Sequence, residues 1–199
     1  MNRDDVEVLA RETCHQGFFR LDRITLRHRL FGGGWSRPLR RELLERGHAA
    51  AVLPYDPVRD EVVLIEQFRI GALEDPGGPW LIEIVAGIIE PGEDPEAVVR
   101  REAVEEAGIT LRELVPVHEF ILSPGGSSER IHLYCGRVDA AGAGGIHGLP
   151  EEGEDIRVMA LPFERAWALV EAGRVRSAIP LVALQWLALN RERLRASWR

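Results

Sequence analysis

The chain has 199 residues, 45% of them hydrophobic, which is enough apolar material for one α/β domain with a buried core. Its formal net charge of −7 disfavours nonspecific binding to nucleic acid or to an anionic membrane. All 25 basic residues are arginine, which excludes a P-loop lysine and Schiff-base chemistry. An acidic chain that acts on phosphates needs a positive intermediary, and a divalent cation would supply it.

The cysteine count and the apolar stretches indicate the compartment. Cys14 and Cys135 are too few for a zinc-finger set or a disulfide framework, so a reducing cytoplasm is expected. The N-terminus lacks the apolar core of a signal peptide. The longest apolar stretch, residues 178–189, is interrupted by Pro180 and Gln185 and is shorter than the ~20 residues of a membrane span. We therefore expect a cytoplasmic protein without a membrane partner.

The first half of the chain reads mainly as strands. Partial alternation of apolar side chains with arginines over residues 17–30 predicts a β-rich N-terminal segment, which glycines 32–34 interrupt. Further strands are expected at 48–54, at 61–68 after a turn at 56–60, and at 80–85.

A helix is predicted at Pro95–Ala107. Asp94 can cap it, Pro95 suits the first helical position, and Gly108 ends it. Strands at 114–122, 131–138 and 156–161 follow, with a Gly- and acid-rich loop at 140–155, and two helices at 163–171 and 179–196 end the chain.

Strands that surround one helix favour an α/β/α sandwich with a mixed central sheet. We expect residues 1–47 to form the small N-terminal β-rich segment and residues 48–199 the main domain.

Three glutamates gather on one face of the predicted central helix. Glu102 and Glu106 are one turn apart, and Glu105 is three residues from Glu102 on the same side. Like charges at this spacing destabilise a helix by about 0.2–0.5 kcal/mol per pair, and a bound cation reverses that sign. Clustered carboxylates without histidine suit hard cations that prefer oxygen ligands, Mg²⁺ or Mn²⁺. The alternative is a solvated acidic face in which Arg101 pairs with Glu105.

Residues 87–109 resemble the Nudix box, G-x5-E-x7-R-E-U-x-E-E-x-G-U, in which U is an aliphatic residue. Its defined positions correspond to Gly87, Glu93, Arg101, Glu102, Ala103, Glu105, Glu106, Gly108 and Ile109. Outside the box the chain resembles the ADP-ribose pyrophosphatase branch of the family over nearly its full length. The residues that carry this are 17–19, 41–42, 45–49, 66–69, 123–130, 148 and 151–155, with Pro124 similar to the marker proline of that branch.

The resemblance implies a Nudix fold and a homodimer whose N-terminal segment dimerises. It also implies Mg²⁺-dependent hydrolysis of ADP-ribose to AMP and ribose 5-phosphate, with Mn²⁺ as a substitute. Hydrolysis of another nucleotide sugar, GDP-mannose or ADP-mannose, is the nearest alternative. A non-catalytic nucleotide-sensing module is a further one, although a sensor would not need the acidic loop that follows the box.

The resemblance also assigns roles to the acidic residues. It places metal ligands at Glu102, Glu106 and the carbonyl of Ala86, with Glu105 as a bridging ligand. Matching the acidic loop to the family puts the general base at Glu152 and a further metal ligand at Glu154. Glu151 is the rival for the base, because Pro150 and Gly153 could shift the register of the loop. Glu93 is expected to pair within the loop that precedes the helix.

Substrate residues follow from the same resemblance and from side-chain chemistry. Arginine clamps phosphate oxygens and stacks on adenine, which suits Arg41 and Arg69. Phe18 is expected to stack on the adenine from the partner subunit, whereas the alternative is a core aromatic. Glu42 and Arg46 either bind the adenine edge or pair with each other. The remaining substrate residues implied by the resemblance are Phe19, Ile88, Ser123 and Glu129.

Overall fold

The computed structural model describes residues 1–198, with the side chain of Glu152 outside that description. Two compact units divide the chain, and each is described by itself. The first contains residues 1–48 and 121–130, and the second contains residues 49–120 and 131–199. The loop at 121–130 thus belongs with the N-terminal strands, although a long stretch of sequence separates them.

The first unit is built on a three-stranded antiparallel sheet in the order β1-β2-β3. Its elements are a 3₁₀ turn at Arg3–Asp5 and strands β1 (Val6–Gln16), β2 (Arg20–His28) and β3 (Leu39–Glu45). The β structure expected over 17–30 is confirmed as β2. Every residue of β1 is exposed, so this strand lacks the alternation by which a half-buried strand is predicted from sequence.

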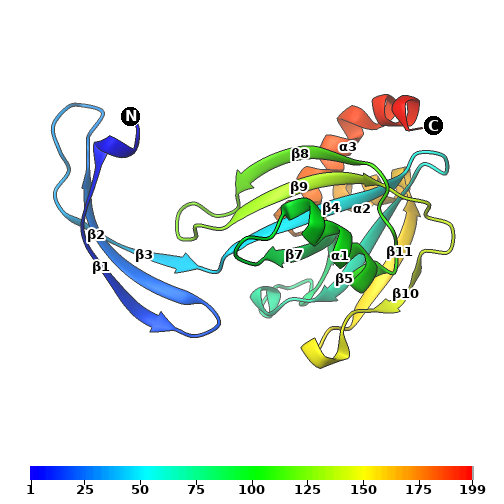
Figure 1. Ribbon diagram of the computed structural model, residues 1–199, viewed down its shortest axis with the longest axis horizontal. Helices are drawn as coiled ribbons and strands as arrows, with labels where there is room; N and C mark the ends of the chain where they lie inside the picture. The colour runs from blue at the N-terminus through cyan, green and yellow to red at the C-terminus, as the bar shows by residue number, and fades with distance from the viewer. Residues whose placement is uncertain (199) are drawn as a thin grey trace. The chain divides into compact units, whose positions relative to one another are not determined.

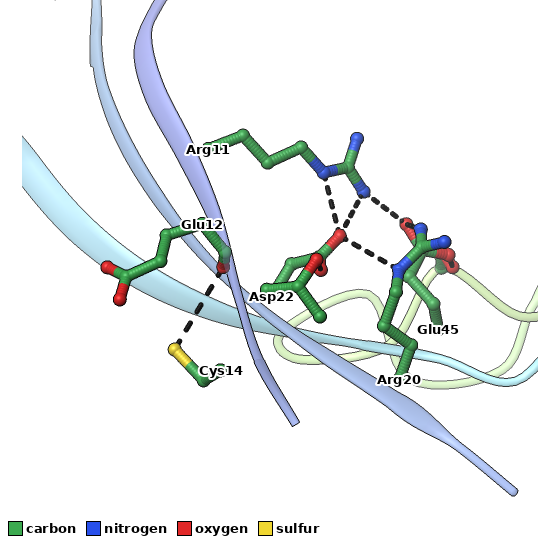
Figure 2. Close-up of polar contacts among 8 residues, drawn as sticks. Arg11, Glu12, Cys14, Arg20, Asp22 and Glu45 are labelled. Carbon is green, nitrogen blue, oxygen red and sulfur yellow. Dashed lines mark hydrogen bonds and ion pairs between the residues drawn. The ribbon is translucent and has the colours of Figure 1, made fainter. Parts of the chain in front are cut away.

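A buried carboxylate joins the three strands of the first unit (Figure 2). Asp22 on β2 is 1% exposed and accepts hydrogen bonds from Arg11 Nε at 2.7 Å, Thr13 Oγ1 at 2.9 Å and Arg20 Nε at 3.2 Å. Burial alone would raise the pKa of Asp22, but these hydrogen bonds and the two guanidinium charges together lower it. Arg11 also donates to Glu45 on β3, 2.8 Å away, so one arginine connects all three strands.

The second unit contains a mixed eight-stranded sheet. Its main path runs β10-β11-β5-β4-β9-β8, while β6 pairs with β5 and β7 pairs with β4. The β4–β9 pair is parallel, and β10–β11, β11–β5, β5–β4 and β5–β6 are antiparallel. The strands are β4 (His48–Asp56), β5 (Glu61–Phe68), β6 (Trp80–Glu83), β7 (Val85–Ile89), β8 (Leu114–Ile121), β9 (Arg130–Arg137), β10 (Gly144–His147) and β11 (Ile156–Pro162).

Helices cover both faces of this sheet (Figure 1). Helix α1 (Pro95–Ala107) lies across one face, and α2 (Phe163–Glu171) and α3 (Ala178–Ser197) lie on the other. Because strand side chains alternate, Ala50, Val52, Val63 and Ile65 join the buried cluster with α1. The predicted α/β/α sandwich with a mixed sheet is therefore confirmed. No helix within residues 1–198 is long and apolar enough to cross a membrane.

Three local expectations are corrected. Asp94 occupies the N-cap position of α1, but its side chain makes no capping hydrogen bond. The strand expected at 80–85 ends at Glu83 as β6, and a second strand, β7, begins at Val85; β6 pairs with β5, whereas β7 pairs with β4. The loop expected at 140–155 contains β10, which pairs with β11, and a 3₁₀ turn at Pro150–Glu152.

Candidate active site

The acidic face of α1 packs against β7, and its most buried member is Glu106. This carboxylate is 3% exposed and accepts a hydrogen bond from the backbone N–H of Ala86 at 3.0 Å. Burial raises the pKa of Glu106 to about 8, and the negative charges of Glu102 and Glu154 contribute to that rise. The Ala86 N–H and the positive charge of Arg69 act in the opposite direction. The site therefore holds a carboxylate whose negative charge is not fully compensated.

Glu102 lies one turn before Glu106, and its pKa is also raised. Burial is the largest cause of the rise, and the positive charge of Arg101 acts against it. Arg101 Nη1 donates to Glu102 Oε1 at 2.7 Å and to Glu105 Oε2 at 3.0 Å. The Arg101–Glu105 pair of the alternative interpretation is thus present, but Arg101 also contacts Glu102, and Glu106 on the same face is buried and not solvated. A Cβ on Gly87 would overlap the carboxylate of Glu102, so glycine at this position lets the acid approach the backbone of β7.

The acidic loop at 148–155 is connected to α1 through its backbone. The N–H of Gly148 donates to the carbonyl of Glu105 at 3.3 Å. Glu154 accepts a hydrogen bond from the N–H of Leu149 at 3.1 Å, and its charge raises the pKa of both Glu102 and Glu106. Glu151 is exposed on the same loop. The side chain of Glu152, the predicted base, lies outside the described residues.

The end of β5 brings a cation to the same site. Arg69 Nε donates to Glu83 Oε2 on β6 at 2.8 Å, and the Arg69 charge lowers the pKa of Glu106. Gln67 precedes it by two residues on the strand, is 6% exposed, and leaves its Nε2 without a hydrogen-bond partner. Neither Gln67 nor Glu83 received a role from the sequence. A buried amide donor without a hydrogen-bond partner is unusual and marks a candidate functional residue. The sequence could not have identified Gln67 in this way, because its burial and its missing partner depend on the folded structure.

The residues present fit a divalent cation by their chemistry. Glu102, Glu105, Glu106 and Glu154 offer only oxygen donors, which hard cations prefer. Two of these carboxylates are destabilised by burial and by their neighbours' charges, and a cation would relieve both effects. Within the described residues, however, no three His, Cys, Asp or Glu side chains form a group that could hold a metal. The metal-ligand set therefore stays a prediction.

In the first unit, four of the predicted substrate residues form one connected group. Phe18 and Phe19 contact edge to face with centroids 4.9 Å apart, and the Arg46 guanidinium lies 5.4 Å from the Phe19 ring. Arg46 Nη1 is 3.4 Å from Glu129 Oε2, while its buried Nε has no partner. Phe18 is 85% exposed, so it is not a core aromatic.

The remaining substrate candidates of the first unit are placed separately. Arg41 and Glu42 are neighbours on β3, and Arg41 donates to the carbonyl of Arg40 at 2.8 Å. Glu42 lies 4.0 Å from Arg23, so the expected alternative of a Glu42–Arg46 pair is wrong. Ser123 accepts backbone hydrogen bonds from Gly126 and Ser127 through its carbonyl, in the loop that also carries Glu129.

The loop with Ser123 and Glu129 is tied to the end of β3. The Leu44 N–H donates to the Gly126 carbonyl at 2.8 Å, and the Ser128 hydroxyl donates to the Glu45 carboxylate. Glu45 in turn accepts from Arg11 of the Asp22 group. The buried ion group of this unit thereby positions the loop that carries two predicted substrate residues.

Comparisons with known proteins identify one family profile and several relatives. A family profile described as NUDIX domain matches residues 45–181. ADP-ribose pyrophosphatase of Escherichia coli K12 is 54% identical over 98% of this chain and 94% of its own length. The protein of the same name from Haemophilus influenzae is 47% identical over 100% of this chain and 93% of its own length.

More distant similarities include a second activity and a solved structure. GDP-mannose pyrophosphatase of Cronobacter sakazakii is 36% identical over 94% of this chain and 96% of its own length. A crystal structure described as ADP compounds hydrolase superposes with a TM-score of 0.72 at 21% identity. It covers 97% of this chain and 96% of that one, and at this identity it supports the fold alone.

Neutralising Glu106 should change how stability depends on pH. The pKa of Glu106 in the folded protein is about 8, which lies above the ordinary value for a glutamate. The stability that protonated Glu106 contributes is therefore present at low pH and is lost as the pH rises through 8. Each pKa unit corresponds to about 1.4 kcal/mol. The Tm of the metal-free protein should therefore fall between pH 5 and 9, and Glu106→Gln should flatten this fall and raise Tm at pH 8.

Thermal melts with and without a divalent cation provide the measurement. The cation should stabilise the unsubstituted protein more at pH 8 than at pH 6 and should stabilise Glu106→Gln much less. Glu96→Gln, an exposed position in the first turn of the same helix, is the matched control. Equal pH slopes for the unsubstituted protein and Glu106→Gln would contradict the account of this carboxylate.

Proposed function

This chain belongs to the Nudix family, and on that premise we propose that it hydrolyses ADP-ribose to AMP and ribose 5-phosphate with Mg²⁺, or with Mn²⁺ in its place. The assignment of the substrate rests on the 54% identity to an ADP-ribose pyrophosphatase over almost the whole chain. Members of the family generally use a divalent metal, in agreement with the carboxylates gathered at α1.

The metal ligands are proposed to be Glu102, Glu106, the bridging Glu105, Glu154 and the carbonyl of Ala86. A bound cation stabilises charge on the phosphates and lowers the pKa of water. Burial of Glu106 and its bond to the Ala86 N–H fix the innermost carboxylate, while Arg101 orients Glu102 and Glu105.

Glu152 is proposed to take the proton from the attacking water. The water oxygen forms a new bond to one phosphorus, the bond from that phosphorus to the bridging oxygen breaks, and the leaving phosphate keeps the electron pair. A carboxylate that binds a cation tightly is a poor base, so a separate acid on the loop suits this step. Arg69 would neutralise phosphate oxygens, and Ile88 on β7 would contact the substrate.

The first unit is proposed to bind the adenosine side of the substrate in a homodimer. It exposes apolar side chains at Val8 on β1 (59%), at Phe18 in the turn between β1 and β2 (85%) and at Phe31 in the loop after β2 (98%), and β1 is exposed along its whole length. A small sheet normally needs a buried apolar face for stability, and a second copy of the chain would cover this one. We propose that Phe18 stacks on the adenine bound by the partner subunit, with Phe19, Arg41, Glu42, Arg46, Ser123 and Glu129 completing the pocket.

The location proposed for the enzyme is the cytoplasm, where its two free cysteines would stay reduced. Its partner there is a small nucleotide sugar, and the net charge of −7 disfavours nucleic acid and anionic membranes.

A substrate panel tests the reaction directly. ADP-ribose should be hydrolysed faster than GDP-mannose or ADP-mannose, only with a divalent cation, and chromatography should resolve AMP and ribose 5-phosphate. GDP-mannose is included because a relative with that activity is 36% identical. Glu102→Gln should nearly abolish turnover and keep the fold, because its charge would hold the cation that stabilises the transition state. Ordinary Mg²⁺-dependent rates in this variant would overturn the assignment of the site.

The base is tested by three single variants at saturating ADP-ribose across a Mg²⁺ series. A positioned base contributes about 10²–10⁴ in rate, so Glu152→Gln should lower kcat by that order and leave substrate binding intact. Glu151→Gln should be nearly neutral, and Glu154→Gln intermediate and partly rescued by higher Mg²⁺. A severe loss in Glu151→Gln would shift the assignment by one residue. If kcat falls only a few-fold in all three variants, the general base lies in the Nudix box, with Glu105 as the next candidate.

Phe18→Ala tests the partner contribution. Stacking of a base on an aromatic ring is worth about 1–3 kcal/mol, so KM should rise much more than kcat falls. Val58→Ala truncates an exposed apolar side chain (74%) in the turn between β4 and β5 of the second unit, and its KM should be unchanged. Sedimentation should show a dimer for all of these proteins, and a fully active monomer would refute the proposed contribution of Phe18.

A further inference from the structure

Arg176 ties together two segments of the second unit that are far apart in sequence. It lies in the short connection between α2 and α3. Its guanidinium pairs with the carboxylate of Asp75, and Nη2 donates to the carbonyls of Gly77 at 3.1 Å, Gly78 at 2.9 Å and Trp80 at 3.2 Å. One side chain thus contacts three residues of the loop between β5 and β6 and the first residue of β6, with Nη1 facing the carboxylate and Nη2 facing the carbonyls, which uses both ends of the planar guanidinium.

The same loop begins at Arg69. The Arg69 N–H donates to the carbonyl of Pro79 at 2.8 Å, which closes the loop next to the acceptors of Arg176. The Arg69 side chain is held by Glu83, three residues beyond Trp80. Between these ends the loop is exposed, with Ile70 at 70% and Leu73 at 54%. The backbone that carries Arg69 is therefore fixed from one side by β5 and from the other by the segment that Arg176 holds.

Gly77 gives independent support for this arrangement. A Cβ at this position would overlap the Arg176 guanidinium, and no positive φ requires glycine here. Alanine at 77 would therefore be accepted by the backbone but would displace Arg176. In contrast, a Cβ at Gly71 of the same loop would meet no atom within 4 Å, and Gly71 also lacks a positive φ.

We propose that Arg176 is a positioning residue that sets Arg69 for the phosphates of the substrate by clamping the loop between β5 and β6. The proposal rests on the proposed function for the identity of that substrate and for the contact of Arg69 with its phosphates. Because Arg176 acts on a binding group and not on the proton transfer, its loss should weaken substrate binding more than it slows the chemical step.

The kinetic test compares variants of Arg176 and Gly77 with two matched controls. Arg176→Ala and Gly77→Ala should raise KM for ADP-ribose about tenfold, as expected for part of one charge-assisted contact, with kcat within about threefold. Arg176→Lys should rescue only partly, since an ammonium lacks the fork. Arg174→Ala and Gly71→Ala should match the unsubstituted protein. Arg174 is exposed, and within the described residues its side chain makes no hydrogen bond or ion pair.

A double variant separates positioning from a general loss of stability. If Arg176 acts through Arg69, then Arg176→Ala should add little to the KM of Arg69→Ala. Additive effects, or a KM unchanged in both Arg176→Ala and Gly77→Ala, would overturn the proposal while ADP-ribose hydrolysis by the unsubstituted protein stood.

Amide hydrogen exchange gives a readout that needs no substrate. Arg176→Ala should speed exchange at the Arg69 and Gly78 amides, which close the loop, and leave the amides of β4 unchanged. If the unsubstituted protein prefers GDP-mannose, the KM comparison is made with that sugar. If the protein hydrolyses neither ADP-ribose nor GDP-mannose, the proposed function fails, and amide exchange at Arg69 alone tests the role of Arg176. An unchanged exchange rate at Arg69 in Arg176→Ala would then refute that role.

Discussion

The uncompensated charge of Glu106 is the constraint on which the rest of the site depends. Its carboxylate is 3% exposed and is destabilised by the charges of Glu102 and Glu154, against which only one backbone N–H and the positive charge of Arg69 act. Placing an acid there costs stability unless a proton or a cation neutralises it. An acid placed at such a cost in stability is a candidate for a functional role, and the oxygen donors around it would suit the hard cation that we propose for this site.

The scaffold of the second unit explains how these acids meet. Helix α1 packs its apolar side on β4 and β5, and its acidic face therefore turns toward β7 and the acidic loop. Because Gly87 has no side chain, the carboxylate of Glu102 can lie against the backbone of β7. A hydrogen bond from the Gly148 N–H to the Glu105 carbonyl connects the acidic loop to the helix. Arg69 follows directly after β5, and its positive charge lowers the pKa of Glu106; it begins the loop that Arg176 holds.

Local sequence rules predicted the parts of the fold that local chemistry determines. Helix α1 runs from Pro95 to Ala107 as predicted, because proline favours its first position and Gly108 adopts the left-handed φ of 63° that ends it. The break at Ile84 could not be predicted, since residues 80–89 form an almost continuous apolar run and only the pairing partners differ. Likewise, spacing predicted the acidic face of α1, but the pKa of Glu106, the unpaired Gln67 amide and the reach of Arg176 depend on contacts between distant segments.

Proton release on cation binding tests this account most directly. Burial raises the pKa of Glu106 to about 8, so near pH 7 the carboxyl is mostly protonated and would have to lose its proton to act as the proposed metal ligand. Calorimetric titration of the protein with Mn²⁺ in buffers of different ionisation enthalpy measures the number of protons released per bound cation. We expect release of close to one proton near pH 7, falling toward zero above pH 9 and absent in Glu106→Gln. Tight binding without proton release, or the same release from Glu106→Gln, would contradict the claim that this buried carboxylate is neutralised by the metal.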